Sequence, residues 1–99
     1  MVVLLLQVTE LVRHVSAEPS LLRSLLAELA EWFAHSNRWN RRQTFALLCS
    51  HLTVKHVLLE EIFAKDILPH LLDLSLDPVP NVRLSVARTI STNIMSQGN

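Results

Sequence analysis

The sequence predicts an all-α protein built as a short superhelix of stacked helix pairs. Apolar residues recur at helical spacing along nearly the whole chain. Val and Ile never alternate strictly with polar residues over the length of a strand. The pattern of apolar and polar residues also returns after about 41 residues, which is typical of an array of helical repeats.

Five helices are expected, and their bounds follow from the apolar periodicity and the prolines. The spacing predicts helices over residues 2–14, 19–35, 39–53, 57–76 and 80–96. Pro19 and Pro80 suit the first position of a helix, because the N–H missing from proline is not needed there. Pro69 falls inside an apolar-periodic stretch, so we expect it to bend its helix.

The internal repeat includes polar as well as apolar residues. Ala46 and Ser50 return as Ala87 and Ser91, at an offset of 41 residues. This period lies within the range of about 40–47 residues found in HEAT and armadillo arrays. A plain bundle of five similar helices is the alternative, but it would not explain the matching polar residues.

The whole chain, 1–99, is therefore predicted to be a single HEAT-type α-α superhelix of about two and a half repeats. Residues 1–15 would be the second helix of an incomplete repeat. Complete repeats would follow in residues 19–53 and 57–96.

One segment of the chain carries a resemblance to a known family. Residues 68–83, LPHLLDLSLDPVPNVR, resemble a HEAT repeat of the regulatory and scaffold subunits of type 2A and type 4 protein phosphatases. The shared marks are a proline in the first helix, an aspartate at the turn, and Asn-Val-Arg at the start of the second helix. Together with residues 39–46, WNRRQTFA, the segment is most similar to the subunit 1 family of phosphatase 4 regulators, or to a short subunit-1-like relative.

The resemblance implies a non-catalytic regulatory or scaffold element that binds a type 4-like phosphatase catalytic subunit through its repeat turns. The candidate contact residues are Asn37, Arg38, Trp39 and Arg41 in the first turn and Pro78, Val79 and Asn81 in the second. The resemblance also gives Arg42, Asp77 and Arg83 a structural role, in a ladder where a turn aspartate bonds backbone or arginine of neighbouring repeats. This sequence departs from that pattern, because the counterpart of Asp77 is Ser36 or Asn37.

Trp39 supports an interaction role independently of the resemblance. It lies among Arg38, Asn40, Arg41 and Arg42, and tryptophan and arginine are the side chains that most often anchor interfaces. The alternative is that the indole folds back over the next helix pair and packs there as a hydrophobic staple.

Catalytic, metal and cofactor chemistry are not expected. No two of the five histidines have the i, i+4 spacing of a helical zinc site. The single cysteine, Cys49, falls on an apolar stripe, where burial would raise its pKa and make it unreactive. Gly98 is the only glycine, so a glycine-rich phosphate loop is not possible.

The charge balance bears on partners and on location. Nine Lys and Arg balance nine Asp and Glu, so neither nucleic acid nor a membrane surface is an expected partner. Three arginines around Trp39 suit a single nucleic-acid strand, but their electrostatic footprint is small. The apolar start of the chain has no basic residues before it, so we expect no secretory signal. With one cysteine, the chain is expected in the cytosol or the nucleus.

Two other interpretations of the repeat pattern remain open. About three repeats are usually needed for a stable array, so the chain would alternatively be a truncated paralogue fragment without specific binding. A generic HEAT adaptor that binds some other protein is the second alternative.

Overall fold

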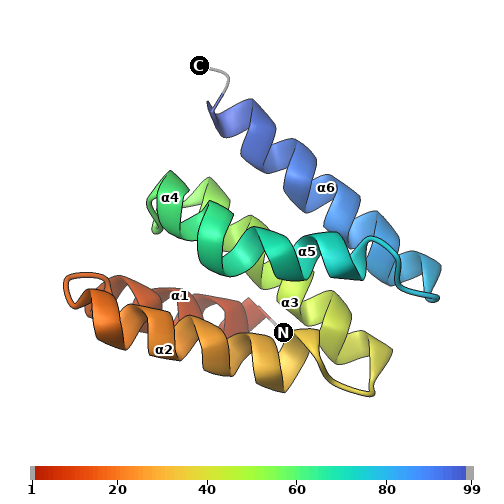
Figure 1. The fold of residues 1–99 in the computed structure, drawn as a ribbon, viewed down its shortest axis with the longest axis horizontal. Coiled ribbons are helices and arrows are strands. Elements are labelled where there is room, and N and C mark those ends of the chain that lie inside the picture. The colour runs from red at the N-terminus through yellow and green to blue at the C-terminus, as the bar shows by residue number, and fades with distance from the viewer. Residues whose placement is uncertain (1, 98–99) are drawn as a thin grey trace.

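The computed structural model describes residues 2–97, and every regular element among them is helical. Figure 1 shows the arrangement. The elements are α1 (Val2–Val15), α2 (Pro19–Leu29), η1 (Ala30–Ala34), α3 (Trp39–Val54), α4 (Glu60–Ile62), η2 (Phe63–Ile67), α5 (Leu68–Leu74) and α6 (Pro80–Gln97). The η segments are π-helical turns that continue α2 and join α4 to α5, so the chain forms five helical rods. The all-α fold class is confirmed. The predicted superhelix covers residues 1–99, and of these Met1 and residues 98–99 lie outside the described residues.

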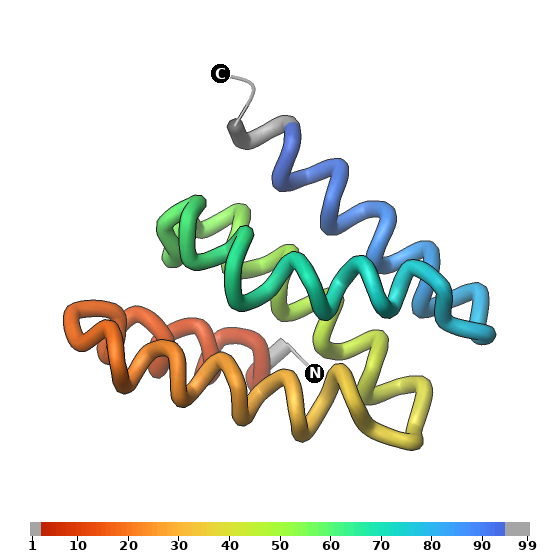
Figure 2. The backbone as a smooth tube through the Cα atoms, viewed as in Figure 1, coloured from red at the N-terminus to blue at the C-terminus, as the bar shows by residue number. Residues whose placement is uncertain are grey.

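The five rods form two layers of a short superhelix of HEAT type. The first helices of the two pairs contact each other, α2 with η2 and η1 with α5. The second helices contact each other as well, since α3 lies between α1 and α6. Figure 2 follows this stacking along the chain, from α1 through the pair of α2 and α3 to the pair of α5 and α6.

Helix α3 is the centre of the molecule because it packs against α1, η1 and α6. Its consecutive residues Thr44, Phe45 and Ala46 are all buried, which requires neighbours on more than one side of the helix. Complete burial of a side chain such as Phe45 stabilises the fold by about 1.5–3 kcal/mol. The core therefore runs through the contact between the two helix pairs.

The prolines have the positions that the sequence indicates. Pro19 and Pro80 are the first residues of α2 and α6. At Pro69 the rod continues, and the turn before it is the wide π-helical segment η2. There the N–H of Leu68 bonds the carbonyl of Phe63, five residues earlier, and Ile67 has φ −115°. The distortion expected at Pro69 is thus taken up in the preceding turn.

The fourth rod begins at Glu60, three residues later than predicted, because the end of α3 has its own cap. His56 takes a left-handed conformation, with φ 53°. Its N–H bonds the carbonyl of Thr53, and the N–H of Val57 bonds the carbonyl of Leu52, both at 3.1 Å. This is the Schellman arrangement, which usually has glycine in the left-handed position. A histidine there gives no such signal in the sequence.

Within residues 2–97 there is no helix with the length and apolar character that crossing a bilayer requires.

Candidate protein-interaction surface

The turn between α5 and α6, residues 75–79, is organised by Asp77. The Asp77 side chain is buried, and its Oδ1 accepts the backbone N–H of Val79 at 2.9 Å. Arg83, in the first turns of α6, donates from Nη1 to the backbone carbonyl of Asp77 at 2.7 Å. The aspartate and the arginine together fix the path of the chain from one helix of the pair into the next.

The turn between η1 and α3, residues 35–38, repeats these bonds with a serine in the place of the aspartate. Ser36 Oγ accepts the backbone N–H of Arg38 at 3.2 Å. Arg42 donates from Nη1 to the backbone carbonyl of Ser36 at 3.0 Å. Both bonds have the same spacing in sequence as their counterparts at Asp77. Between the two residues that the sequence offered as its counterpart, the geometry selects Ser36.

Arg42 also couples the two turns to each other. Its Nε donates to Asp77 Oδ2 at 2.5 Å and its Nη2 donates to Oδ1 at 3.2 Å. The guanidinium therefore makes a bidentate contact with the carboxylate. The side chains are 16% and 4% exposed. These hydrogen bonds from Arg42, followed by that from Val79, hold the pKa of Asp77 below its ordinary range, although burial opposes the shift. The structure thus brings Arg42, Asp77 and Arg83 into one cluster.

The two turns lie on the same side of the molecule, at the right of Figure 1, and expose most of the candidate contact residues. Val79 is half-buried and packs against the core, while the others are exposed. The exposed candidates are Asn37, Arg38, Trp39, Arg41, Pro78 and Asn81. They form a ridge that a partner can reach without rearrangement of the core. We call these six residues the turn ridge.

Trp39 is the first residue of α3, and its side chain is 43% exposed. An indole that was fully folded over the next helix pair would be mostly buried, so the geometry leaves Trp39 accessible to a partner. Arg42, in contrast, is held by Asp77 and Ser36. Of the arginines around Trp39, those at 38 and 41 are the exposed ones, which leaves two cations for any acidic surface.

Trp32 is 57% exposed in η1, and the sequence pattern alone does not mark it as a candidate contact residue. It stands in an apolar-rich stretch, where helical periodicity alone suggests burial. The neighbouring Ala30 and Ala34 are the buried residues of this turn. The wider π-helical turn changes the direction of each side chain relative to an α-helix, which a sequence pattern does not reveal.

Further polar contacts join the helix pairs, and single residues give no sequence signal for them. Thr89 Oγ1 lies 2.8 Å from the carbonyl of Ala46, across the contact between α6 and α3. His35 Nε2 lies 3.2 Å from His70 Nδ1, which links the end of η1 to α5. Each bond needs residues about 35–43 positions apart, which only the folded chain brings together.

Cys49 and the metal-ligating residue types are the remaining candidates for chemistry among the described residues. Cys49 is buried, and burial raises the pKa of its thiol. Within residues 2–97 there is no group of three or more His, Cys, Asp or Glu side chains that is able to hold a metal ion. The exposed turn ridge is therefore the site that we consider for function.

A short HEAT-type superhelix with an exposed ridge of turns belongs to a class of repeat structures that present extended binding surfaces. Over 92 residues, 91% of the chain, the sequence is 34% identical to serine/threonine-protein phosphatase 4 regulatory subunit 1 of Rattus norvegicus. The proteins of that name from Homo sapiens and Mus musculus match to the same degree. The chain spans 10% of the length of these relatives. Neither a family model nor a solved structure matches it.

The similarity supports a relationship between this chain and one segment of the regulatory subunit 1 family. It covers nearly all of the chain, and so includes both helix pairs and both turns. The relatives are named as regulatory subunits and not as the catalytic subunit of the phosphatase.

Proposed function

We propose that this chain is a non-catalytic regulatory element that binds a type 4-like serine/threonine phosphatase catalytic subunit through the turn ridge. The observation that carries the proposal is the similarity to phosphatase 4 regulatory subunit 1 over 92 residues, which spans both helix pairs. The mechanism is positioning, since stacked helix pairs are stiff and set where a bound subunit lies relative to its substrate. We also propose a cytosolic or nuclear location, which the single cysteine supports because one cysteine cannot form an internal disulfide.

Trp39 and Arg41 are the residues that we expect to contribute most to this contact. Both are exposed at the start of α3, and the cluster of Arg42, Asp77 and Arg83 fixes the backbone beneath them. A rigid scaffold lowers the entropy lost on binding. Tryptophan and arginine also lead among residues whose truncation weakens interfaces.

The test measures binding of the purified catalytic subunit of protein phosphatase 4 to the chain by biolayer interferometry. We expect binding at micromolar or lower concentrations. The double variant Trp39→Ala, Arg41→Ala should weaken it at least about tenfold, because truncation of an anchor costs more than about 1 kcal/mol.

A matched control removes one exposed apolar and one exposed basic side chain from the other edge of the molecule. Leu59 and Lys55 lie in the turn between α3 and α4, at the left of Figure 1. The double variant Leu59→Ala, Lys55→Ala should bind like the unmodified chain. Absence of binding by a chain whose circular dichroism shows folded helices would refute the proposal and favour a fragment without specific binding.

A generic HEAT adaptor is the second candidate function, supported by the same turn ridge without the phosphatase. It is distinguished by the identity of the partner. If the double variant Trp39→Ala, Arg41→Ala binds the catalytic subunit as tightly as the unmodified chain, the turn ridge is not the binding surface. No binding of that subunit, together with ridge-dependent binding of another protein, would favour the adaptor.

A further inference from the structure

Two histidines from different helix pairs face each other at the surface of the molecule. His35, directly after η1, is exposed, and His70, in α5, is half-buried. Nε2 of His35 lies 3.2 Å from Nδ1 of His70. Because the two residues are 35 positions apart, the spacing of a metal site along one helix does not detect them.

The distance between these two nitrogens fits a shared metal ion. Two nitrogens bound to one tetrahedral Zn²⁺ ion at the usual bond length lie about 3.3–3.4 Å apart. The observed distance of 3.2 Å is only slightly shorter. The ring centroids are 5.2 Å apart, which is less than a straight line through the two nitrogens would give, and the ring planes meet at 61°. The two imidazoles are therefore inclined to each other, as two ligands of one ion are.

Glu31 is placed to set the tautomer of His35. Its Oε2 lies 3.6 Å from Nδ1 of His35, the ring nitrogen that is not in contact with His70. A carboxylate beside one ring nitrogen favours the proton on that nitrogen, and metal-binding histidines usually have such a partner. Nε2 of His35 then keeps its lone pair for an ion.

Packing holds the ring of His70 in place. The ring lies edge to face against Phe45, with the centroids 6.0 Å apart and the planes at 82°. Phe45 is 1% exposed, so the core fixes this neighbour. A side chain that is already ordered loses less entropy when it binds a ligand. His70 is thus preorganised, and the exposed His35 leaves the pair open to solvent.

We propose that His35 and His70 bind a Zn²⁺ ion, which fastens the two helix pairs to each other. His35 coordinates the ion through Nε2 and His70 through Nδ1, while each ring carries its proton on its other nitrogen. Water fills the remaining positions, because a structural zinc site has four protein ligands and this pair supplies two. The ion therefore exchanges with solvent, and the stability of the chain follows the zinc concentration. The inference is independent of the phosphatase.

The pocket between α1 and the end of α3 is a weaker competitor for the ion. His51 and Glu10 line it and are of ligand type, but Arg13 and Lys55 line it as well. The carboxylate of Glu10 is already paired with Arg13. The two cations repel a metal ion, and a single imidazole is left to bind it.

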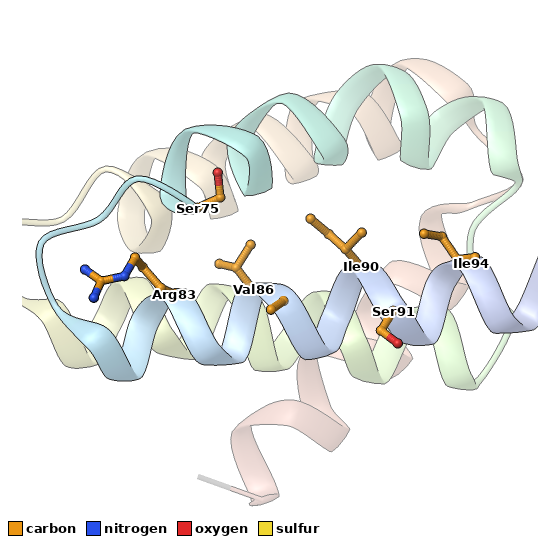
Figure 3. Close-up of a pocket in the computed structure, with 7 residues that line it drawn as sticks. Ser75, Arg83, Val86, Ile90, Ser91 and Ile94 are labelled. Carbon is orange, nitrogen blue, oxygen red and sulfur yellow. The ribbon is translucent and has the colours of Figure 1, made fainter.

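The groove along α6, about 580 Å³ in volume, is the wrong environment for a cation (Figure 3). Figure 3 shows Ile90 and Ile94 along the helix and Arg83 at the end nearest the turn. None of the described residues that line the groove is a histidine, a cysteine or a carboxylate. Of these three places, only the histidine pair has two imidazole nitrogens at the spacing that one ion requires.

The test measures binding of ZnCl₂ to the 99-residue chain by isothermal titration calorimetry, and the Tm of the chain at each zinc concentration. We expect one ion per chain with a Kd below about 100 µM, because imidazole is a good zinc ligand and the pair is preformed. Free zinc at about ten times the Kd should raise Tm by at least about 5 °C. MgCl₂ is the control salt and should leave Tm unchanged, since Mg²⁺ prefers oxygen ligands.

Single variants locate the site. His35→Ala and His70→Ala should each weaken zinc binding at least about tenfold and remove the rise in Tm, measured against the metal-free Tm of the same variant. His14→Ala is the matched control, because it removes an exposed histidine of α1 and should change neither quantity. Glu31→Gln should weaken zinc binding about tenfold and leave the metal-free Tm nearly unchanged, because Glu31 acts only through the tautomer of His35.

If an alanine variant does not fold, His35→Asn or His70→Asn takes its place, since asparagine is closer in size to histidine. Absence of zinc binding up to about 1 mM would overturn the proposal. So would zinc binding that survives the loss of either histidine. Zinc-dependent dimerisation in sedimentation that needs only one of the two histidines would also overturn it, because the ion would then bridge two chains.

Discussion

In the turn after η1, Ser36 accepts the N–H of Arg38, and its carbonyl accepts the guanidinium of Arg42. In the turn after α5, Asp77 makes the same two bonds with Val79 and Arg83, and its carboxylate also binds Arg42 of the other pair. The shared bonds shape each turn, and a serine is sufficient for them. The ion pair that joins the two turns requires the second carboxylate oxygen, which only the second turn has.

The largest expected effect comes from removal of that carboxylate. Asp77→Ala leaves the Arg42 guanidinium, in a side chain that is 16% exposed, without its charged partner. Loss of one member of a buried ion pair costs about 3–5 kcal/mol, and we expect the lower end here. Urea denaturation followed by circular dichroism measures the change in the free energy of unfolding.

The matched control is Asp73→Ala, which removes an exposed aspartate from α5 and should change stability by less than about 0.5 kcal/mol. If Asp77→Ala does not fold, Asp77→Asn gives a smaller loss, because the amide oxygen still accepts the N–H of Val79. A loss below about 1 kcal/mol for the alanine variant would show that the ion pair of Asp77 with Arg42 does not stabilise the contact between the two turns.

A smaller effect is expected where the pairs are joined away from the turns. Thr89→Val keeps the shape of the side chain and removes the hydroxyl, which lies 2.8 Å from the carbonyl of Ala46 and 2.8 Å from that of Ser85 within α6. A buried hydrogen bond of this kind contributes about 0.5–1.5 kcal/mol. Thr92→Val is the control, because its hydroxyl bonds only within α6 in an exposed position. Equal losses in the two variants would argue against coupling through Thr89.

The contact between His35 and His70, which joins the two helix pairs, should make the free energy of unfolding depend on pH. Burial, followed by the neighbouring His35, lowers the pKa of His70 from 6.5, although Asp73 and Asp66 oppose the shift. The unfolded chain therefore binds more protons than the folded chain as the pH falls through 6.5. The free energy of unfolding should decrease from about pH 7 to about pH 5.

Urea denaturation over that pH range checks this expectation. The variant His70→Asn should flatten the dependence on pH, whereas the control His14→Asn, on the exposed surface of α1, should leave it unchanged. A free energy of unfolding that rises as the pH falls would contradict the lowered pKa of His70.

The smallest effect is expected from insertion of a carboxylate into the first turn. In Ser36→Asp the side chain keeps the bond to the N–H of Arg38. The residue one period before Arg42 is Met1, so no arginine of a preceding pair is available. Denaturation should show a change within about 0.5 kcal/mol. A gain of several times that size would mean that the first turn is coupled in the same way as the second.

The fold was predictable because each helix carries its own apolar periodicity. The starts of α2 and α6 at Pro19 and Pro80 follow from local chemistry. The late start of α4 did not follow, since His56 closes the preceding helix in a conformation that usually indicates glycine. The apolar periodicity made no prediction for Trp32, which is exposed in the π-helical turn η1.

For the candidate site, the sequence identified the turns and the structure decided which side chains are accessible. Trp39 remains 43% exposed, a result that the sequence left open between an anchor and a staple. Val79 packs partly against the core, although its neighbour Pro78 is exposed. Exposure depends on what the other helix pair covers, and no local pattern records that.

The sequence by itself determined the helices, their period of 41 residues and the polar residues that shape each turn, because these depend on local spacing. The tertiary structure alone decided that Arg42 reaches Asp77 and that Thr89 reaches Ala46. These features join residues about a repeat apart. Their energies depend on burial and on distance, which arise when one helix pair stacks on the next.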